Sequence, residues 1–172
     1  DAQFGNRMGA VLDIATNKTF DEQLSGNVDV NLIMSEAMLN YKPVDKGFIS
    51  LSGRRSYYDL FLPKSLFSEI EFIAWPQFYD YQLEGGYDFN KKYKLSALFF
   101  GTDDYMSFKF ADANDTRVQE FGINNISWQS GYDVQSMHLT SALSNSNYIL
   151  TSIYHRNNYN ITDLGGIYYV SA

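Results

Sequence analysis

The chain of 172 residues contains no cysteine, so it holds no disulfide framework, thiolate metal site or cysteine nucleophile. Basic residues are also few: the net charge of −7 and pI near 4.7 argue against a nucleic-acid-binding protein, which normally carries a basic stripe. No stretch approaches the ~18 consecutive apolar residues of a transmembrane helix. Any membrane-spanning structure in this chain would therefore be a β-barrel.

A signal peptide is missing as well, since Asp1 to Gly5 are polar and acidic. An exported barrel protein requires one, so we expect that Asp1 is not the start of translation. Aromatic residues, in contrast, are abundant: they make up 17% of the chain, with 14 Tyr, 13 Phe and 2 Trp. Tyrosine suits a boundary between oil and water because its ring is apolar and its hydroxyl is not.

The clearest pattern is a hairpin between Pro76 and Gly101, in which apolar and polar residues alternate along both arms. Successive strand side chains point to opposite faces, so the hairpin has one apolar and one polar face. A soluble sheet covering a core and a membrane barrel both produce this pattern. The first arm alternates from Tyr79 to Phe89, which favours the barrel, because soluble strands usually stop after ~5 or 6 residues and spanning strands need ~9 to 11.

The same alternation predicts about eight strands in an all-β, antiparallel, up-and-down barrel segment. Short turns are expected at 45–47, 90–92 and 131–133, and longer loops at 64–76, 111–117 and 154–160. The second arm of the hairpin is expected to continue towards Phe110. This alternation of short turns and long loops is typical of outer-membrane barrels.

Several runs resemble TonB-dependent outer-membrane receptors. F-G-N-R-M-G-A-V-L-D-I-A, from Phe4 to Ala15, resembles the end of that family's plug domain. S-G-N-V-D-V-N-L, K-G-F-I-S-L-S-G-R-R-S-Y-Y-D-L-F-L-P and the hairpin through Asp104 are similar to its first barrel strands. The resemblance implies that 1–19 end a plug-like domain with its connector, and that 20–172 form the N-terminal part of a larger barrel.

From the resemblance we also expect a role in importing a scarce nutrient across the outer membrane of a Gram-negative bacterium. The implied partners are outer-membrane lipids, lipopolysaccharide, possible other outer-membrane subunits and the inner-membrane energy-coupling complex, which would act through parts outside this chain. No enzymatic activity, cofactor or nucleic-acid partner is expected. The resemblance does not name the transported substrate, because specificity would depend on the plug and on other loops.

Arg54 and Arg55 are adjacent, so in a strand one of them must face lipid. At ~3.3 Å per residue and a ~45° tilt, Arg55 is roughly 19 Å above Gly47, near the far interface. There an ordinary ion pair at the rim or in the lumen is the common role for such a residue, and the alternative is that Arg55 snorkels to lipopolysaccharide phosphates. Arg54 is expected to face the lumen.

Asp80, Glu84 and Asp88 form an acidic row on the polar face. Residues four apart along a strand are ~13 Å from each other, too far for paired carboxylate catalysis. The row is therefore expected to line a lumen and to pair with Arg54 or Lys94.

Other candidate sites have weaker patterns. Asp103-Asp104 and the loop Asp112–Asp115 lack the spacing of a calcium site, and His138 and His155 lack metal-ligand spacing, so no metal is expected. An aromatic cluster near one loop is expected to form an interfacial girdle, with ligand contact as the alternative. Its members are Tyr57, Tyr58, Phe61, Trp75, Phe78 and Tyr79.

Two hypotheses of other classes accompany the transporter. One is a structural barrel subunit of a larger outer-membrane assembly. The other is a soluble β-sandwich that binds carbohydrate through its tyrosines. A sandwich would hide the apolar face beneath a second layer of the same chain, whereas a barrel would leave it exposed to lipid.

Overall fold

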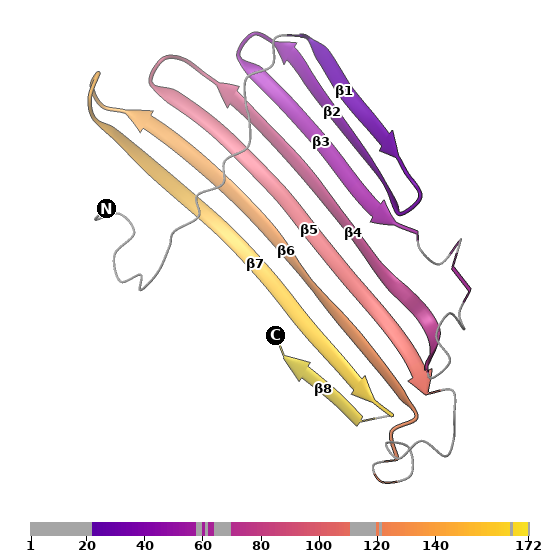
Figure 1. Ribbon diagram of the computed structural model, residues 1–172. Helices are drawn as coiled ribbons and strands as arrows, with labels where there is room; N and C mark the ends of the chain where they lie inside the picture. Colours follow the sequence, from indigo (N-terminus) through magenta and orange to yellow (C-terminus); the bar gives the residue numbers. More distant parts are fainter. Residues whose placement is uncertain are drawn as a thin grey trace.

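The computed structural model describes residues 22–57, 60, 62–63, 70–110, 120, 122–165 and 167–171. These residues form eight β-strands (Figure 1). The strands are β1 (Leu24–Val30), β2 (Met34–Val44), β3 (Gly47–Ser56), β4 (Ile70–Asp88), β5 (Tyr93–Phe110), β6 (Asn125–Ala142), β7 (Tyr148–Leu164) and β8 (Ile167–Ser171). The plug-derived strand expected within 1–19 lies outside the described residues.

All eight strands belong to one antiparallel sheet in the order β1 to β8, so each strand pairs with its neighbours in sequence. This confirms the expected all-β, up-and-down arrangement. The sheet is open, because β1 and β8 form its two edges and do not pair with each other. A closed barrel is therefore not present in the described part of the chain.

Short polar turns join the strands at one end of the sheet, which we call the short-turn end. In the β4–β5 turn, the Asn90 side-chain oxygen accepts hydrogen bonds from the backbone N–H groups of Lys92 and Tyr93, at 2.7 and 3.0 Å. Ser144 similarly accepts from the N–H of Asn147 in the β6–β7 turn. Asn and Ser stabilise such turns because their side chains replace a backbone acceptor.

Three expected interruptions are strands instead. The predicted turn at 131–133 lies inside β6, the predicted loop at 154–160 lies inside β7, and β4 already begins at Ile70, within the predicted loop 64–76. The expectation failed in β7 because polar residues occupy both faces there, so no two-residue period remains in the sequence. The continuation of β5 to Phe110 is confirmed.

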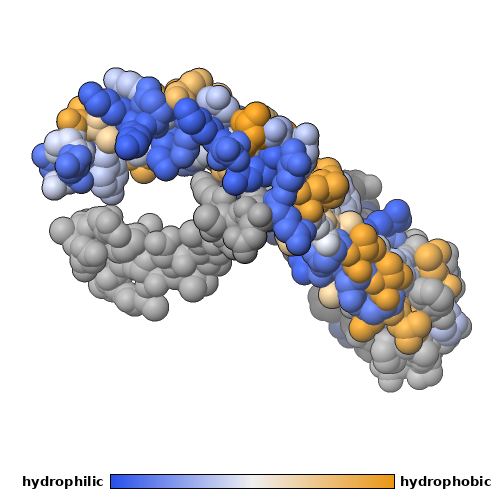
Figure 2. Space-filling model, turned by 90° about the horizontal axis from the view of Figure 1, so that it is seen from above, coloured by the Kyte–Doolittle hydropathy of each residue, from blue (hydrophilic) through white to orange (hydrophobic). Residues whose placement is uncertain are grey.

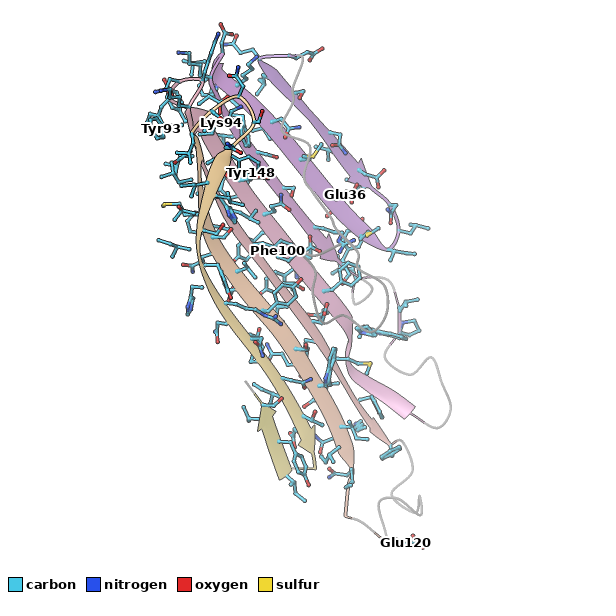
Figure 3. The ribbon with its side chains drawn as sticks, turned by 90° about the vertical axis from the view of Figure 1, so that its left-hand side faces the viewer. Glu36, Tyr93, Lys94, Phe100, Glu120 and Tyr148 are labelled. Carbon is cyan, nitrogen blue, oxygen red and sulfur yellow. The ribbon has the colours of Figure 1, made fainter. Side chains whose placement is uncertain are left out.

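The sheet is curved, and Figure 2 shows it as an arc when viewed from the short-turn end. The cross-strand register assigns side chains to its two faces. In Figure 3, Tyr93 projects from the convex side, whereas Phe100 lies on the concave side. Both faces are solvent-accessible: Trp75, at 7% exposure, is the only buried large hydrophobic residue in the described part of the chain.

Candidate functional site

The concave face carries a charged row that crosses several strands. Glu36 of β2 is paired in register with Arg54 of β3, which is in turn opposite Asp80 of β4. The Arg54 guanidinium contacts the Asp80 carboxylate through Nη2 at 2.7 Å and donates from Nε at 2.8 Å. A second ion pair joins Lys94 to Asp88 at 3.0 Å. The ion pairs expected for Asp80 and Asp88 are thus present.

Glu84, the middle member of the acidic row, has a different environment. It is only 4% exposed, although it lies on the same face as Asp80 and Asp88. Its register partners are Ser50 of β3 and Leu98 of β5. The row is therefore one buried carboxylate between two that are partly exposed and ion-paired.

A polar hollow of about 380 Å³ lies on the concave face beside the Arg54–Asp80 pair. It is lined by polar side chains of Thr102, Asp104 and Ser130 and by the rings of Phe100 and Tyr132. The two ring centroids are 5.5 Å apart.

Guanidinium groups extend this aromatic surface. Arg156 lies 5.8 Å from the centroid of the Tyr132 ring, and Arg54 lies 5.3 Å from that of Phe78. Two rings in tilted contact, beside paired charges and hydroxyl groups, form a surface suited to a polar ligand with an apolar side.

The convex face carries an exposed apolar band near the short-turn end. Leu39, Leu51 and Phe99 are 48%, 49% and 45% exposed, although each is a large hydrophobic residue within a paired strand. The members of this apolar band are Leu24, Leu39, Ile49, Leu51, Leu83, Leu95, Ala97, Phe99, Met137, Leu139, Ile149 and Ile153. No second layer covers the band among the described residues.

Exposed tyrosines border the apolar band on both sides. Tyr41, Tyr87 and Tyr93 lie near the short turns, and Tyr79 and Tyr81 lie at the opposite border. From Phe89 to Tyr79 the chain spans roughly 33 Å along the strand at ~3.3 Å per residue, or about 23 Å of height at a ~45° tilt. This height is close to the ~25 Å apolar band of outer-membrane barrels.

Beyond Tyr81 the convex face becomes polar. Two tyrosines there each reach across a neighbouring strand to an aspartate on the strand after it, and we call each of these contacts a crossing. Tyr81 of β4 lies over Gly101 of β5, and its hydroxyl donates to Oδ1 of Asp133 on β6 at 2.9 Å. A Cβ at Gly101 would lie 2.6 Å from the Tyr81 ring. Glycine is therefore required there for the tyrosine to reach across a whole strand.

The second crossing runs in the opposite direction one row further on. Tyr159 of β7 lies over Gly131 of β6, and its hydroxyl donates to Asp103 of β5. Gln129 Nε2 also donates to Asp103, at 3.0 Å. Neither crossing was predicted from the sequence, where Gly131 and Asp133 instead indicated a turn. The signal available in the sequence is that a glycine precedes an aspartate by two residues in both strands: Gly101 and Asp103 in β5, and Gly131 and Asp133 in β6.

Arg55 lies on the convex face, opposite in direction to Arg54. It is paired in register with Tyr79, which is opposite Asp103. Arg55 is thus placed at the border where the apolar band gives way to polar residues, and it is exposed.

The aromatic cluster expected to form one girdle is divided by the structure. Tyr79 lies on the convex face, Phe78 lies on the concave face against Arg54, and Trp75 is buried, with its Nε1 donating to the Leu62 carbonyl at 3.1 Å. Tyr57 donates to the Met34 carbonyl at 2.8 Å. Tyr58 and Phe61 lie outside the described residues. The described members of this set therefore do not lie on one face, because adjacent strand residues such as Phe78 and Tyr79 point opposite ways.

The two histidines cannot share a metal, because His138 is concave and His155 is convex. His138 instead contacts the hydroxyls of Ser152 and Ser136, at 2.8 and 3.2 Å. Within the described ranges no group of three potential metal ligands occurs. Asp103 and Asp104 also face opposite ways, and the loop Asp112–Asp115 lies outside these ranges.

The comparisons with known proteins gave no relative. No family model, curated protein or solved structure matches this chain. A search of the described residues for helices long and apolar enough to cross a membrane also found none.

Proposed function

We propose that this chain is part of an outer-membrane β-barrel transporter of the TonB-dependent receptor class. The observation that carries the proposal is the apolar band, which is exposed on a single-layered sheet and bordered by tyrosines on both sides. A water-soluble protein rarely exposes so large a contiguous apolar surface. Hydrocarbon is the solvent that suits it, and the tyrosine borders suit the two membrane interfaces.

The concave face then lines an aqueous lumen. Arg54, Asp80, Glu84 and Asp88 belong to its wall, and the hollow beside Phe100 and Tyr132 is the surface on which a nutrient would bind during import. The inner-membrane energy-coupling complex is the partner that would drive this import. Arg55, at the far border of the band, would snorkel to lipopolysaccharide phosphates.

The absence of native cysteine makes a direct test possible. Single cysteines at Leu83 and at its neighbour Gln82 would be treated with a water-soluble maleimide in outer membranes of cells that express the protein. The proposal expects Leu83→Cys to be protected and Gln82→Cys to be labelled, and both to be labelled after solubilisation in denaturant. Equal labelling of both positions in intact membranes would contradict a lipid-facing band.

The open edges support a second candidate, a barrel subunit that serves as a structural component of a larger assembly. Val28 and Val30 at one edge and Val170 at the other are between 68% and 74% exposed. Further strands must cover these edges in a membrane, because unpaired backbone groups are costly in lipid. Uptake of a nutrient by cells carrying the protein, and its loss on deletion, would distinguish the transporter from the structural subunit.

A further inference from the structure

The convex face contains an apolar hollow at the end of the band nearest the short turns. Its volume is about 480 Å³, within the ~300–1,000 Å³ range of ligand pockets. The hollow exists because Gly85 and Ala97 are paired neighbours with little or no side chain, while larger residues surround them. Its apolar lining includes Val44, Ile49, Gly85, Tyr87, Leu95 and Ala97.

A cluster of lysines surrounds the same end of the sheet. Five of the eight lysines in the chain fall within residues 42–46 and 88–94. With Asp45 and Asp88 these segments have a net charge of +3, in a chain whose total is −7. The cluster is therefore a local reversal of the protein's charge.

Three of these lysines lie in the two turns that border the hollow, and one of them, Lys46, also lines a neighbouring hollow with Lys94 and Asp88. Lys46 lies in the β2–β3 turn, between hollow-lining Val44 and Gly47, and Lys91 and Lys92 lie in the β4–β5 turn that follows Tyr87. All three are exposed, and none forms an ion pair within the described ranges. Lys94, in contrast, is neutralised by Asp88 on the concave face.

We propose that this hollow binds an anionic phospholipid of the leaflet at the short-turn end. An acyl chain would fill the space over Gly85 and Ala97, and the phosphate would lie among Lys46, Lys91 and Lys92. The inference rests on the proposed function, since the band must face lipid. An anionic phospholipid has an apolar acyl chain at one end and a negatively charged phosphate at the other. It therefore matches an apolar hollow that has lysines beside it.

The hollow can be filled without disturbing the sheet. A Cβ at Gly85 would meet only the Phe48 carbonyl oxygen, at 3.5 Å, which is an ordinary contact. Gly53 offers a matched control, because its Cβ would meet only the Asp80 carbonyl oxygen, at 3.6 Å, and it lies on the same face in a separate hollow that no lysine lines. Gly85→Leu and Gly53→Leu thus add equal bulk at two places on one surface.

The experiment uses the protein as purified in mild detergent from the outer membranes of cells that express it, together with any chain that completes its barrel, and reconstituted into vesicles that contain equal amounts of phosphatidylglycerol and phosphatidylcholine. Insertion is first verified by protection of Leu83→Cys from a water-soluble maleimide. The protein is then released in mild detergent, and the retained lipids are counted by native mass spectrometry. Failure at the first step would contradict the proposed function itself, and with it this proposal, before any lipid is counted.

The inserted protein should retain phosphatidylglycerol over phosphatidylcholine, with each nearby lysine contributing about fivefold. The triple variant Lys46→Gln/Lys91→Gln/Lys92→Gln should lose this preference, whereas Lys109→Gln, at the opposite end of β5, should keep it. Gly85→Leu should reduce the amount of retained lipid, and Gly53→Leu should not.

Equal retention of the two lipids by inserted wild-type protein would overturn the proposal, as would an unchanged ratio in the triple lysine variant. Equal losses in Gly85→Leu and Gly53→Leu would also overturn it. If Gly85→Leu instead changed the oligomeric state and left the lipid ratio unchanged, the hollow would be a contact between copies of the chain and not a lipid site.

Discussion

Strands β5, β6 and β7 each have one half near the short turns and one half near the long loops. The two halves differ in which face of the sheet carries apolar residues. Near the short turns, the convex face carries Phe99, Met137 and Ile153, while the concave face carries Ser96, Ser136 and Ser152. Near the long loops, the convex face carries polar residues such as Asp103, Asp133 and Asn157, and the concave face carries Ile126 and Trp128.

Backbone pairing is continuous through both halves. The apolar residues therefore change from the convex to the concave face between the two halves without interrupting the strands. The 17 to 19 residues of β4 to β7 exceed the ~9 to 11 that cross a membrane, so a membrane at the apolar band would leave the long-loop halves in water.

The largest expected effect comes from placing a charge in the apolar band. Leu83→Arg should destabilise the membrane-inserted protein by about 2–4 kcal/mol, as for arginine on the lipid face of a barrel near the midplane. Asn157→Arg, on the convex face of the long-loop half, should cost about 0–1 kcal/mol. Urea titration in lipid vesicles measures both, with the adjacent concave variant Gln82→Arg as a control for charge alone.

A loss of similar size for Leu83→Arg and Asn157→Arg would remove the distinction between the two halves. If neither Leu83→Arg nor Asn157→Arg destabilised the protein, the distinction would also be lost, and water would contact the convex face along the whole strand.

The next effect tests the crossing at the border between the halves. Gly101→Ala should cost about 1–3 kcal/mol through overpacking, because its Cβ would meet a Tyr81 ring whose hydroxyl is held by Asp133. Gly85→Ala, inside the band, should be nearly neutral because its Cβ meets nothing closer than 3.5 Å. Unfolding in vesicles provides the comparison, and the cost of Gly101→Ala should largely disappear in a Tyr81→Ala background.

A smaller effect is expected from the two adjacent arginines. Arg55→Leu should weaken lipopolysaccharide association by about fivefold, since one basic residue near an anionic membrane surface contributes about 1 kcal/mol. Arg54→Leu should leave the association unchanged, because Arg54 lies on the concave face beside Asp80. Lipopolysaccharide that copurifies with each variant is the measurement, and equal losses would show that the two faces are not distinguished.

The smallest effect concerns the Arg54–Asp80 pair itself. Its side chains are 45% and 24% exposed, so solvent screens the pair and its coupling should be about 0.2–1 kcal/mol. A double-mutant cycle with Arg54→Met and Asp80→Asn measures this coupling. A much larger value would mean that the concave wall is drier than a water-filled lumen.

The sequence was most informative where the two faces of a strand differ in polarity. The hairpin from Tyr79 to Phe99 and the segment from Gly47 to Arg55 were predicted as strands because apolar and polar residues alternate there. It was least informative in the long-loop half, where polar residues on both faces made 154–160 look like a loop and Gly131 look like a turn. Local composition cannot distinguish a strand that has polar residues on both faces from a loop.

By itself, the sequence determined that this chain forms antiparallel β-strands with one apolar face, because a two-residue period of hydrophobicity suits no helix. The tertiary structure decided which of the expected ion partners meet, Arg54 with Asp80 and Lys94 with Asp88. It alone decided that Tyr81 and Tyr159 reach aspartates two strands away. These contacts join residues up to 56 positions apart. They depend on the register between strands, which is a property of the assembled sheet and of no single segment.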